Sequence, residues 1–238
     1  STGKRINKAS DDPAGIHQVM RLNAEIQGME TASKNAANGQ SLIDTLDTSL
    51  SEVQSILLRM RELTIRAMSD TNSDADRLAL DSELSQLELE ITRIGSTTSF
   101  GGKPVFDGNL HYLQIGPRSG NTLEVQAYTL SASTLGLTQD LTTRNNAENY
   151  LGIIDTAIED INERRGAAGA LSNRLDFIMS NLDNSKVNLI KSRSTIEDAD
   201  FAAESMKLAK AKILEQVAIA MIAQANARTQ WILKLLEN

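Results

Sequence analysis

The chain has 238 residues, a formal charge of −7 and no cysteine. The lack of cysteine excludes a disulfide scaffold and a thiol nucleophile, and the negative charge argues against a nucleic-acid binder, which usually carries a basic face. Aromatic residues make up only 3% of the chain, which favours thin, Ala- and Leu-rich helix seams over a thick core. No apolar run reaches the roughly 20 residues that a membrane span needs.

A first long helix is predicted from about residue 12 to residue 68. Ser10-Asp11-Asp12-Pro13 places a capping carboxylate before a proline at the first helical position. Small and apolar residues then recur at alternating steps of three and four, a coiled-coil pattern. They are Val19, Leu22, Ile26, Met29, Ser33, Ala36, Gln40 and Ile43 and, after a phase slip, Leu46, Leu50, Val53, Leu57, Met60 and Ala67. A helix of this length needs partners along its whole length.

A second helix and a β-hairpin are predicted to follow. Turn residues 69–74 precede the second helix, whose apolar residues fit a helix folding back along the first: Leu80, Leu84, Leu87, Ile91 and Ile94. Residues 112–115 and 123–126 alternate in polarity on either side of a Gly-rich loop, which is typical of a hairpin. The hairpin is too small to form its own core, so we expect it to cap the helices.

A third long helix and a terminal helix complete the expected architecture. The third carries its apolar face at Leu151, Ile154, Ile158, Ile161, Ala168, Leu175, Ile178, Leu182 and Leu189. Gly166 and Gly169 lie inside it, where we expect a close approach of backbones. Cap residues then predict a break between residues 192 and 200.

The predicted fold is mainly α: long antiparallel coiled-coil helices form an elongated rod with a small β-hairpin in the middle of the chain. We expect four segments. Residues 1–94 and 146–197 form the two helical parts of the rod, residues 95–145 the short β region, and residues 198–238 a terminal coiled-coil helix.

The terminal helix carries an apolar stripe that calls for a partner. Its members recur at helical spacing: Leu214, Val217, Met221, Ala225, Ile232 and Leu235. Lys207, Lys210 and Lys212 raise the alternative of a membrane-surface helix. The basic excess from Phe201 onward is small, so a partner helix is the better interpretation.

No residue pattern predicts catalysis, a cofactor or a metal site. His17 and His111 lie far apart in the sequence, and neither has a partner at metal-ligand spacing. Residues 101–103 lack the other members of a phosphate-binding loop, so a turn is the better interpretation. The pairs Asp11-Asp12 and Asp198/Asp200 lie at predicted helix starts, where carboxylates cap and complement the helix dipole. We therefore expect that the chain is not an enzyme.

Several motifs resemble, in order, the two conserved halves of bacterial flagellins. The N-terminal motifs are residues 3–15 (GKRINKASDDPAG), 32–39 (ASKNAANG), 58–63 (LRMREL) and 98–102 (TSFGG). The C-terminal motifs are residues 173–175 (NRL), 181–184 (NLDN), 196–204 (IEDADFAAE), 213–216 (ILEQ) and 223–226 (AQAN).

The resemblance implies a self-assembling, non-catalytic subunit of the flagellar filament, located outside the cell and exported without a cleaved signal peptide. It implies that other flagellin subunits, an export chaperone and junction or cap proteins are partners. It also implies a helix before Ser1 that would pair with the terminal stripe, and a very short variable region. Arg59, Leu63 and Glu90 match positions by which some flagellins contact a vertebrate innate immune receptor.

Three alternatives stay open at this point. A hook–filament junction protein shares the Asp11-Asp12-Pro13 motif and C-terminal motifs, although residues 61–63 and 223–226 favour flagellin. A flagellin-like surface protein could bind a polysaccharide through Tyr112, Tyr128, Tyr150 or Trp231. An enzyme is the remotest alternative.

Overall fold

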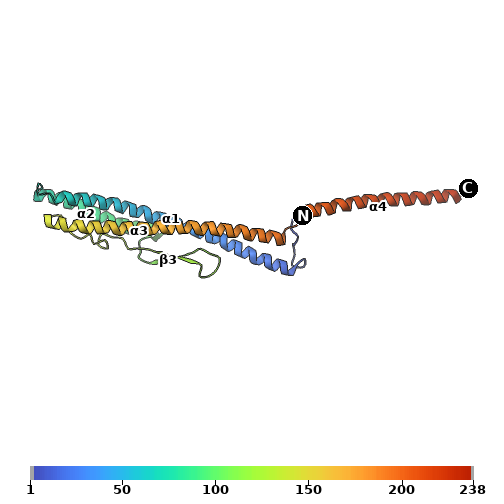
Figure 1. Ribbon diagram of the computed structural model, residues 1–238, viewed down its shortest axis with the longest axis horizontal. Helices are drawn as coiled ribbons and strands as arrows, with labels where there is room; N and C mark the ends of the chain where they lie inside the picture. Colours follow the sequence, from blue (N-terminus) through green and yellow to red (C-terminus); the bar gives the residue numbers. More distant parts are fainter. Residues whose placement is uncertain (1–2, 237–238) are drawn as a thin grey trace. The chain divides into compact units, whose positions relative to one another are not determined.

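The computed structural model describes residues 3–236, with side chains up to Arg228. These residues form helices α1 (Pro13–Ala67), α2 (Asp74–Thr97), α3 (Arg144–Glu197) and α4 (Phe201–Leu236). The strands are β1 (Ser99–Phe100), β2 (Lys103–Pro104), β3 (Leu110–Gln114) and β4 (Thr122–Gln126). The chain divides into two compact units, residues 25–188 and residues 1–24 with 189–238 (Figure 1). All four predicted helices and the hairpin are confirmed.

The helices begin where the capping residues predict. The backbone N–H of Gly15 donates to Asp12 Oδ1 over 2.9 Å at the start of α1. Ser73 and Asp76 form a capping box at the start of α2. Asp200 Oδ1 accepts from the backbone N–H groups of Ala202 and Ala203 at the start of α4. Each carboxylate therefore satisfies amide groups that have no partner inside the helix.

A continuous apolar core joins α1, α2 and α3 within residues 25–188, where the three helices lie side by side (Figure 1). Its fully buried side chains come from these three helices and from residues 123–141, and the largest are Leu50, Leu57, Met60, Leu63, Leu84, Ile91, Leu123, Leu137, Leu141, Tyr150, Ile154 and Ile161. Most of these positions belong to the predicted seams. Since a long helix is stabilised mainly by its lateral contacts, this core is what allows α1 and α3 to exist.

The β3–β4 hairpin packs one face against this core. The two strands pair antiparallel, with Tyr112 opposite Glu124 and Leu113 opposite Leu123. Leu123 and Val125 are buried in the core that the helices share, whereas Tyr112 and Glu124 are exposed. The hairpin therefore covers the sides of the helices with its inner face, and its outer face points away from the core.

The prediction for Gly166 and Gly169 is wrong. A Cβ atom added at either glycine would meet no atom within 4 Å. The close approaches lie elsewhere: a Cβ at Gly28 would lie 2.7 Å from Pro117 Cβ, and one at Gly39 would clash with the Leu113 side chain. Gly28 and Gly39 lie on α1 directly beneath the hairpin, and Gly95 of α2 approaches the backbone more closely still, since a Cβ there would clash with the carbonyl oxygen of Leu130.

Charged side chains tie the helices together outside the core. Arg165 on α3 donates to Asp47 on α1 over 2.8 Å, and Arg61 donates to Asp155 over 2.7 Å. The buried Arg77 donates to the carbonyl oxygens of Ala67, Ser69 and Asn72. Its charge lies at the C-terminal end of α1, where a cation complements the helix dipole.

A second polar tie joins α2 to α3. The hydroxyl of the fully buried Tyr150 donates to Glu88 Oε1 over 2.6 Å. Partial burial raises the pKa of the Glu88 carboxyl above its ordinary value, the Tyr150 hydroxyl opposes that rise, and the nearby Asp81 adds to it. The hydrogen bond from Tyr150 therefore stabilises the ionised form of Glu88, which partial burial and the nearby Asp81 disfavour.

Within the unit formed by residues 1–24 and 189–238, the N-terminal segment contacts the last residues of α3. The backbone N–H of Arg5 donates to the carbonyl of Glu197 over 2.7 Å, and the Arg5 guanidinium donates to the carbonyl of Ile196 over 2.6 Å. Lys4 forms an ion pair with Glu197. The N-terminal segment thus satisfies the last carbonyl groups of α3.

Ile91→Asp should lower the free energy of unfolding by at least about 3 kcal/mol. The change removes apolar burial worth about 1.5–3 kcal/mol and places a charge without a partner in the core. Leu89→Asp on the same helix is the matched control, because Leu89 is exposed; its effect should stay below about 1 kcal/mol. Urea unfolding followed by circular dichroism measures both. An unchanged unfolding midpoint for Ile91→Asp would show that the seam is misplaced.

Tyr150→Phe should destabilise the protein by about 1–3 kcal/mol at pH 7, because the ionised Glu88 loses its donor. The pKa of Glu88 should then rise further above its unfolded-state value. When folding raises the pKa of a carboxyl, the folded state loses stability as the pH increases through that pKa. The cost of the substitution should therefore shrink on acidification, when Glu88 is protonated. Unfolding curves between pH 4 and pH 7 test this, with the exposed Tyr112→Phe as control. A cost independent of pH would contradict the role given to Glu88.

Candidate functional site

The predicted assembly stripe lies on α4 and is open to solvent. Leu214, Val217 and Met221 expose 57%, 52% and 66% of their surfaces, and Ala225 is exposed as well. The side chains of Ile232 and Leu235 lie outside the described residues. The stripe residues thus lie on one continuous helix, where steps of three and four place them along a common line.

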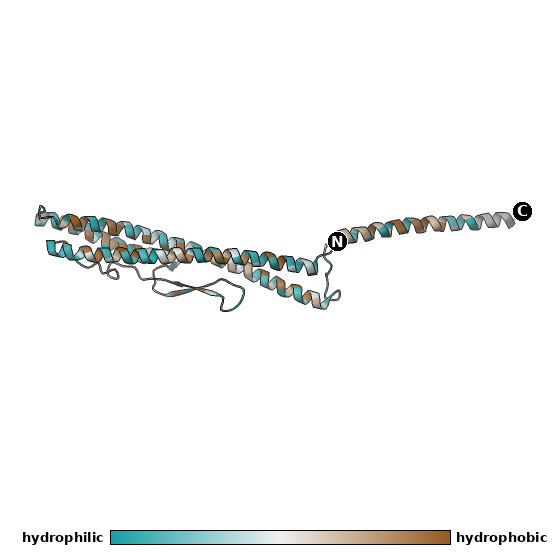
Figure 2. Cartoon of the chain, in the orientation of Figure 1, coloured by the Kyte–Doolittle hydropathy of each residue, from teal (hydrophilic) through white to brown (hydrophobic). Residues whose placement is uncertain are grey.

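Helix α4 exposes more apolar side chains than the predicted stripe contains. Ile213, Ile219 and Ile222 each expose about three-fifths of their surface. At about 100° per residue, Ile219 lies roughly 140° around the helix from Leu214. Figure 2 accordingly shows brown, hydrophobic residues along much of α4. A helix with apolar residues on several sides is typically covered by other elements on several sides. The prediction of a single stripe did not include these additional residues.

The predicted receptor-contact residues lie on α1 and α2 in different environments. Arg59 is a partly exposed side chain that donates to Glu62 and Glu83, each over 2.7 Å at the closest. Glu90 pairs with Arg93 over 2.6 Å, and this hydrogen bond holds the pKa of Glu90 below its ordinary value. Leu63 is completely buried, so its part in any surface is to support the helix packing.

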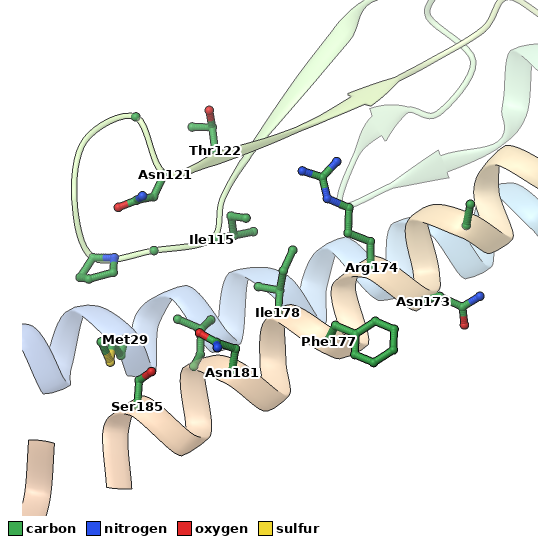
Figure 3. A pocket seen from close by; sticks show the side chains of 15 residues that line it. Met29, Ile115, Asn121, Thr122, Asn173, Arg174, Phe177, Ile178, Asn181 and Ser185 are labelled. Atoms are coloured by element: carbon green, nitrogen blue, oxygen red, sulfur yellow. The ribbon is translucent and has the colours of Figure 1, made fainter. Parts of the chain in front are cut away.

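A groove lies between the hairpin loop and α3 (Figure 3). It has a volume of about 800 Å³ and an apolar lining. Loop residues 115–117 and 120–122 form one wall, α3 forms the other, and Met29 of α1 contributes from below. Arg174 and Phe177 line it from α3. We call this hollow the hairpin groove.

A smaller hollow of about 340 Å³ adjoins the hairpin groove, and the two share Ala170 and Arg174. Here the Arg164 guanidinium lies 4.8 Å from the centre of the Tyr128 ring, at cation–π distance. Arg164 also pairs with Asp160. Both hollows therefore combine apolar walls with a basic side chain.

The described residues hold no cluster of three or more histidine, cysteine or carboxylate side chains that could bind a metal ion. His111 pairs with Asp107 over 3.2 Å, and His17 is an exposed residue of α1. Asp12 and Asp200 act as caps, as described above. Gly101 and Gly102 form the turn between β1 and β2, and Lys103 is the first residue of β2. Among residues 3–236 no helix is long and apolar enough to cross a membrane.

Long helices, an apolar terminal helix left uncovered and a surface of ion pairs define a structural protein of the helical, assembly-forming class. Residues 1–111 match the family model of the bacterial flagellin N-terminal helical region, and residues 151–236 match that of the bacterial flagellin C-terminal helical region. The chain belongs to the bacterial flagellin family.

Relatives extend this similarity along the whole chain. A flagellin of Halalkalibacterium halodurans is 39% identical over 99% of this chain and 89% of its own length. The flagellar filament 31.3 kDa core protein of Treponema maltophilum is 32% identical over 100% of this chain and 90% of its own length. The crystal structure of Bacillus cereus flagellin, 34% identical, superposes with a TM-score of 0.58 over 63% of this chain and 88% of that one. The chain is a structural subunit of the flagellar filament.

Gly28→Ala and Gly166→Ala should have opposite effects on stability. Both replace a helical glycine and gain about 0.5–1 kcal/mol of helix propensity. The Gly166 position is open, so Gly166→Ala should be stabilising by this amount. Gly28→Ala meets Pro117, so it should lose this gain and be destabilising by about 1 kcal/mol. Thermal unfolding compares the two variants, and hydrogen exchange of loop residues 116–121 should be faster in Gly28→Ala alone. Equal stabilisation at both positions would show that the loop does not rest on α1.

Proposed function

We propose that α4 is the principal assembly interface of this filament subunit. The single observation that supports this proposal most strongly is the exposure of its large apolar side chains, from Phe201 at 82% to Val217 at 52%. Isolated apolar residues are ordinary on a protein surface, but a contiguous apolar surface of this kind is typical of an interaction site. The six predicted stripe residues, Leu214, Val217, Met221, Ala225, Ile232 and Leu235, form one side of the interface.

The energetic argument favours burial in a polymer. Six to eight apolar side chains, each worth roughly 1.5–3 kcal/mol when fully buried, supply a drive on the order of 10 kcal/mol before ordering losses. The apolar residues on the other sides of α4, such as Ile219 and Ile222, need cover as well. One partner helix covers one side only, so we propose that α4 contacts helices of more than one neighbouring subunit.

The remaining partner assignments follow from the family resemblance. We propose that the chain acts without catalysis or cofactor, that it is exported without a cleaved signal peptide, and that it meets an export chaperone and junction or cap proteins. The filament role is preferred to a hook–filament junction role or polysaccharide binding, because no observation on the described residues favours either. The four-segment division of the chain stays a prediction.

Recognition by a vertebrate innate immune receptor also stays a prediction. Arg59 and Glu90 offer exposed or partly exposed charged groups on neighbouring helices, and both are engaged in ion pairs within the subunit. A receptor would have to compete with these exposed pairs, which contribute little to stability. Leu63 would act by holding α1 in place.

Met221→Glu in the full-length protein should raise the critical concentration for polymerisation at least tenfold. A charge buried without a partner costs a few kcal/mol, and each 1.4 kcal/mol is a factor of ten. Met221→Leu is the matched control, because it keeps an apolar side chain of similar volume at the same position. Sedimentation and electron microscopy measure filament formation. If Met221→Glu forms filaments at the same critical concentration as the unmodified chain, α4 is not part of the assembly interface.

A further inference from the structure

The geometry assigns the hairpin groove a specific occupant: the outer face of the β3–β4 hairpin from a second copy of this chain. We define that outer face by Leu110, Tyr112 and Glu124. The inference rests on the proposed self-assembly and deepens it by naming a second contact, formed within residues 25–188 and separate from α4. Three observations carry it.

The first observation is an arginine with no partner. Residues 25–188, all of them described, contain ten arginines. Nine of them donate a hydrogen bond or form an ion pair within the subunit. Arg174 is the exception among these described residues. It is exposed, it lines both hollows, and its guanidinium is directed toward the hairpin side of the groove (Figure 3).

The second observation is the apolar rim beside Arg174. Phe177 lies one turn further along α3 and exposes 77% of its surface, among the most exposed large apolar side chains of the described residues. Ile115 and Ile178 line the same hollow from its two walls (Figure 3). The groove thus presents one positive charge next to an aromatic ring and aliphatic walls. Its occupant should carry an aromatic or aliphatic group next to a carboxylate.

The third observation is that the outer hairpin face has this chemistry. Tyr112 is 61% exposed and Leu110 is 38% exposed on β3. Glu124 lies directly opposite Tyr112 on β4 and is exposed, with no hydrogen bond or ion pair within the described residues. Cross-strand neighbours lie about 4.5–5.5 Å apart at Cβ, so the ring and the carboxylate form one patch. Glu124 and Arg174 are therefore complementary charges that both lack a partner within the subunit.

The contact must join two copies. The inner face of the hairpin, with Leu123 and Val125, is buried against the subunit's own helices. The outer residues of the same strands point the opposite way, because side chains alternate along a strand. They cannot turn into the groove of their own subunit. A surface of one copy that fits a different surface of the next is a heterologous contact, and such contacts generate helical filaments when they do not close.

Cysteine pairing tests the contact directly, because the chain has no cysteine of its own. We would prepare full-length Tyr112→Cys and Phe177→Cys as separate proteins, polymerise an equal mixture and oxidise it mildly. Each protein carries one thiol, so a disulfide can form only between copies, and it requires Cα atoms about 4.4–6.8 Å apart. We expect a disulfide-linked dimer on a non-reducing gel from the mixture. The control mixture pairs Phe177→Cys with Leu78→Cys, which is 57% exposed on α2 and should give no dimer.

Charge reversal supplies a second, independent readout. Glu124→Arg and Arg174→Glu each place like charges at the contact and should raise the critical concentration about tenfold. The double variant restores an opposite-charge pair and should return to within about threefold of the unmodified chain. Both residues are exposed, so the melting temperature of the unassembled variants should not change. Recovery in the double variant is a result that a merely local structural effect would not give.

The outcomes separate this inference from the proposed function. If filaments form but the mixture gives no dimer, or if Tyr112→Cys alone gives the dimer by hairpin-to-hairpin contact, the groove contact is wrong while self-assembly stands. If the double charge variant is as impaired as the single variants, the Glu124–Arg174 pairing is wrong. If the unmodified full-length chain forms no filament, the proposed self-assembly fails and this contact fails with it.

Discussion

Lateral burial of one long apolar seam on α1 is the constraint on which the rest of this structure depends. A helix of 55 residues gains little from its own hydrogen bonds, and its stability comes from the faces that it covers. Leu50, Leu57 and Met60 are completely buried because α2 and α3 pack against the same stretch of α1. Further toward the start of α1 the hairpin contributes instead, with Leu113 against Gly39. The short β element is therefore part of the mechanism that keeps a long helix covered.

The sequence predicted the features that come from a repeating apolar pattern and the residues at which each helical repeat begins. Steps of three and four mark a seam over many turns, and residues such as Asp12 and Asp200 mark helix starts by short-range chemistry. The positions of contact between distant segments could not be predicted in this way. The close approach of Pro117 to Gly28 joins residues far apart in the chain, and a helical glycine there looks the same in the sequence as Gly166, which faces open space. The groove is likewise a product of tertiary packing.

The exposed apolar surface of α4 explains a second limit of sequence analysis. A search for one amphipathic stripe finds Leu214, Val217 and Met221 and stops, because an amphipathic surface helix of a globular protein buries one face. Ile219 and Ile222 lie outside that stripe, and their apolar character is explained only if partners pack against several sides of the helix. The two surfaces also differ in kind: burial of α4 supplies a strong, non-directional driving force, whereas the proposed contact at the hairpin groove pairs Arg174 with one opposite charge.

These two kinds of surface solve different problems of assembly. Hydrophobic burial on α4 supplies free energy but tolerates sliding, since apolar contacts impose little direction. In a filament each subunit must sit in one register relative to its neighbours. Complementary charges at defined positions determine this register more than they increase affinity. Most charged groups in residues 25–188, such as Arg165 with Asp47, are already paired inside the subunit and fix its own helices. Charges left without an internal partner, as at Glu124 and Arg174, are consequently the ones that can specify where a neighbouring subunit sits.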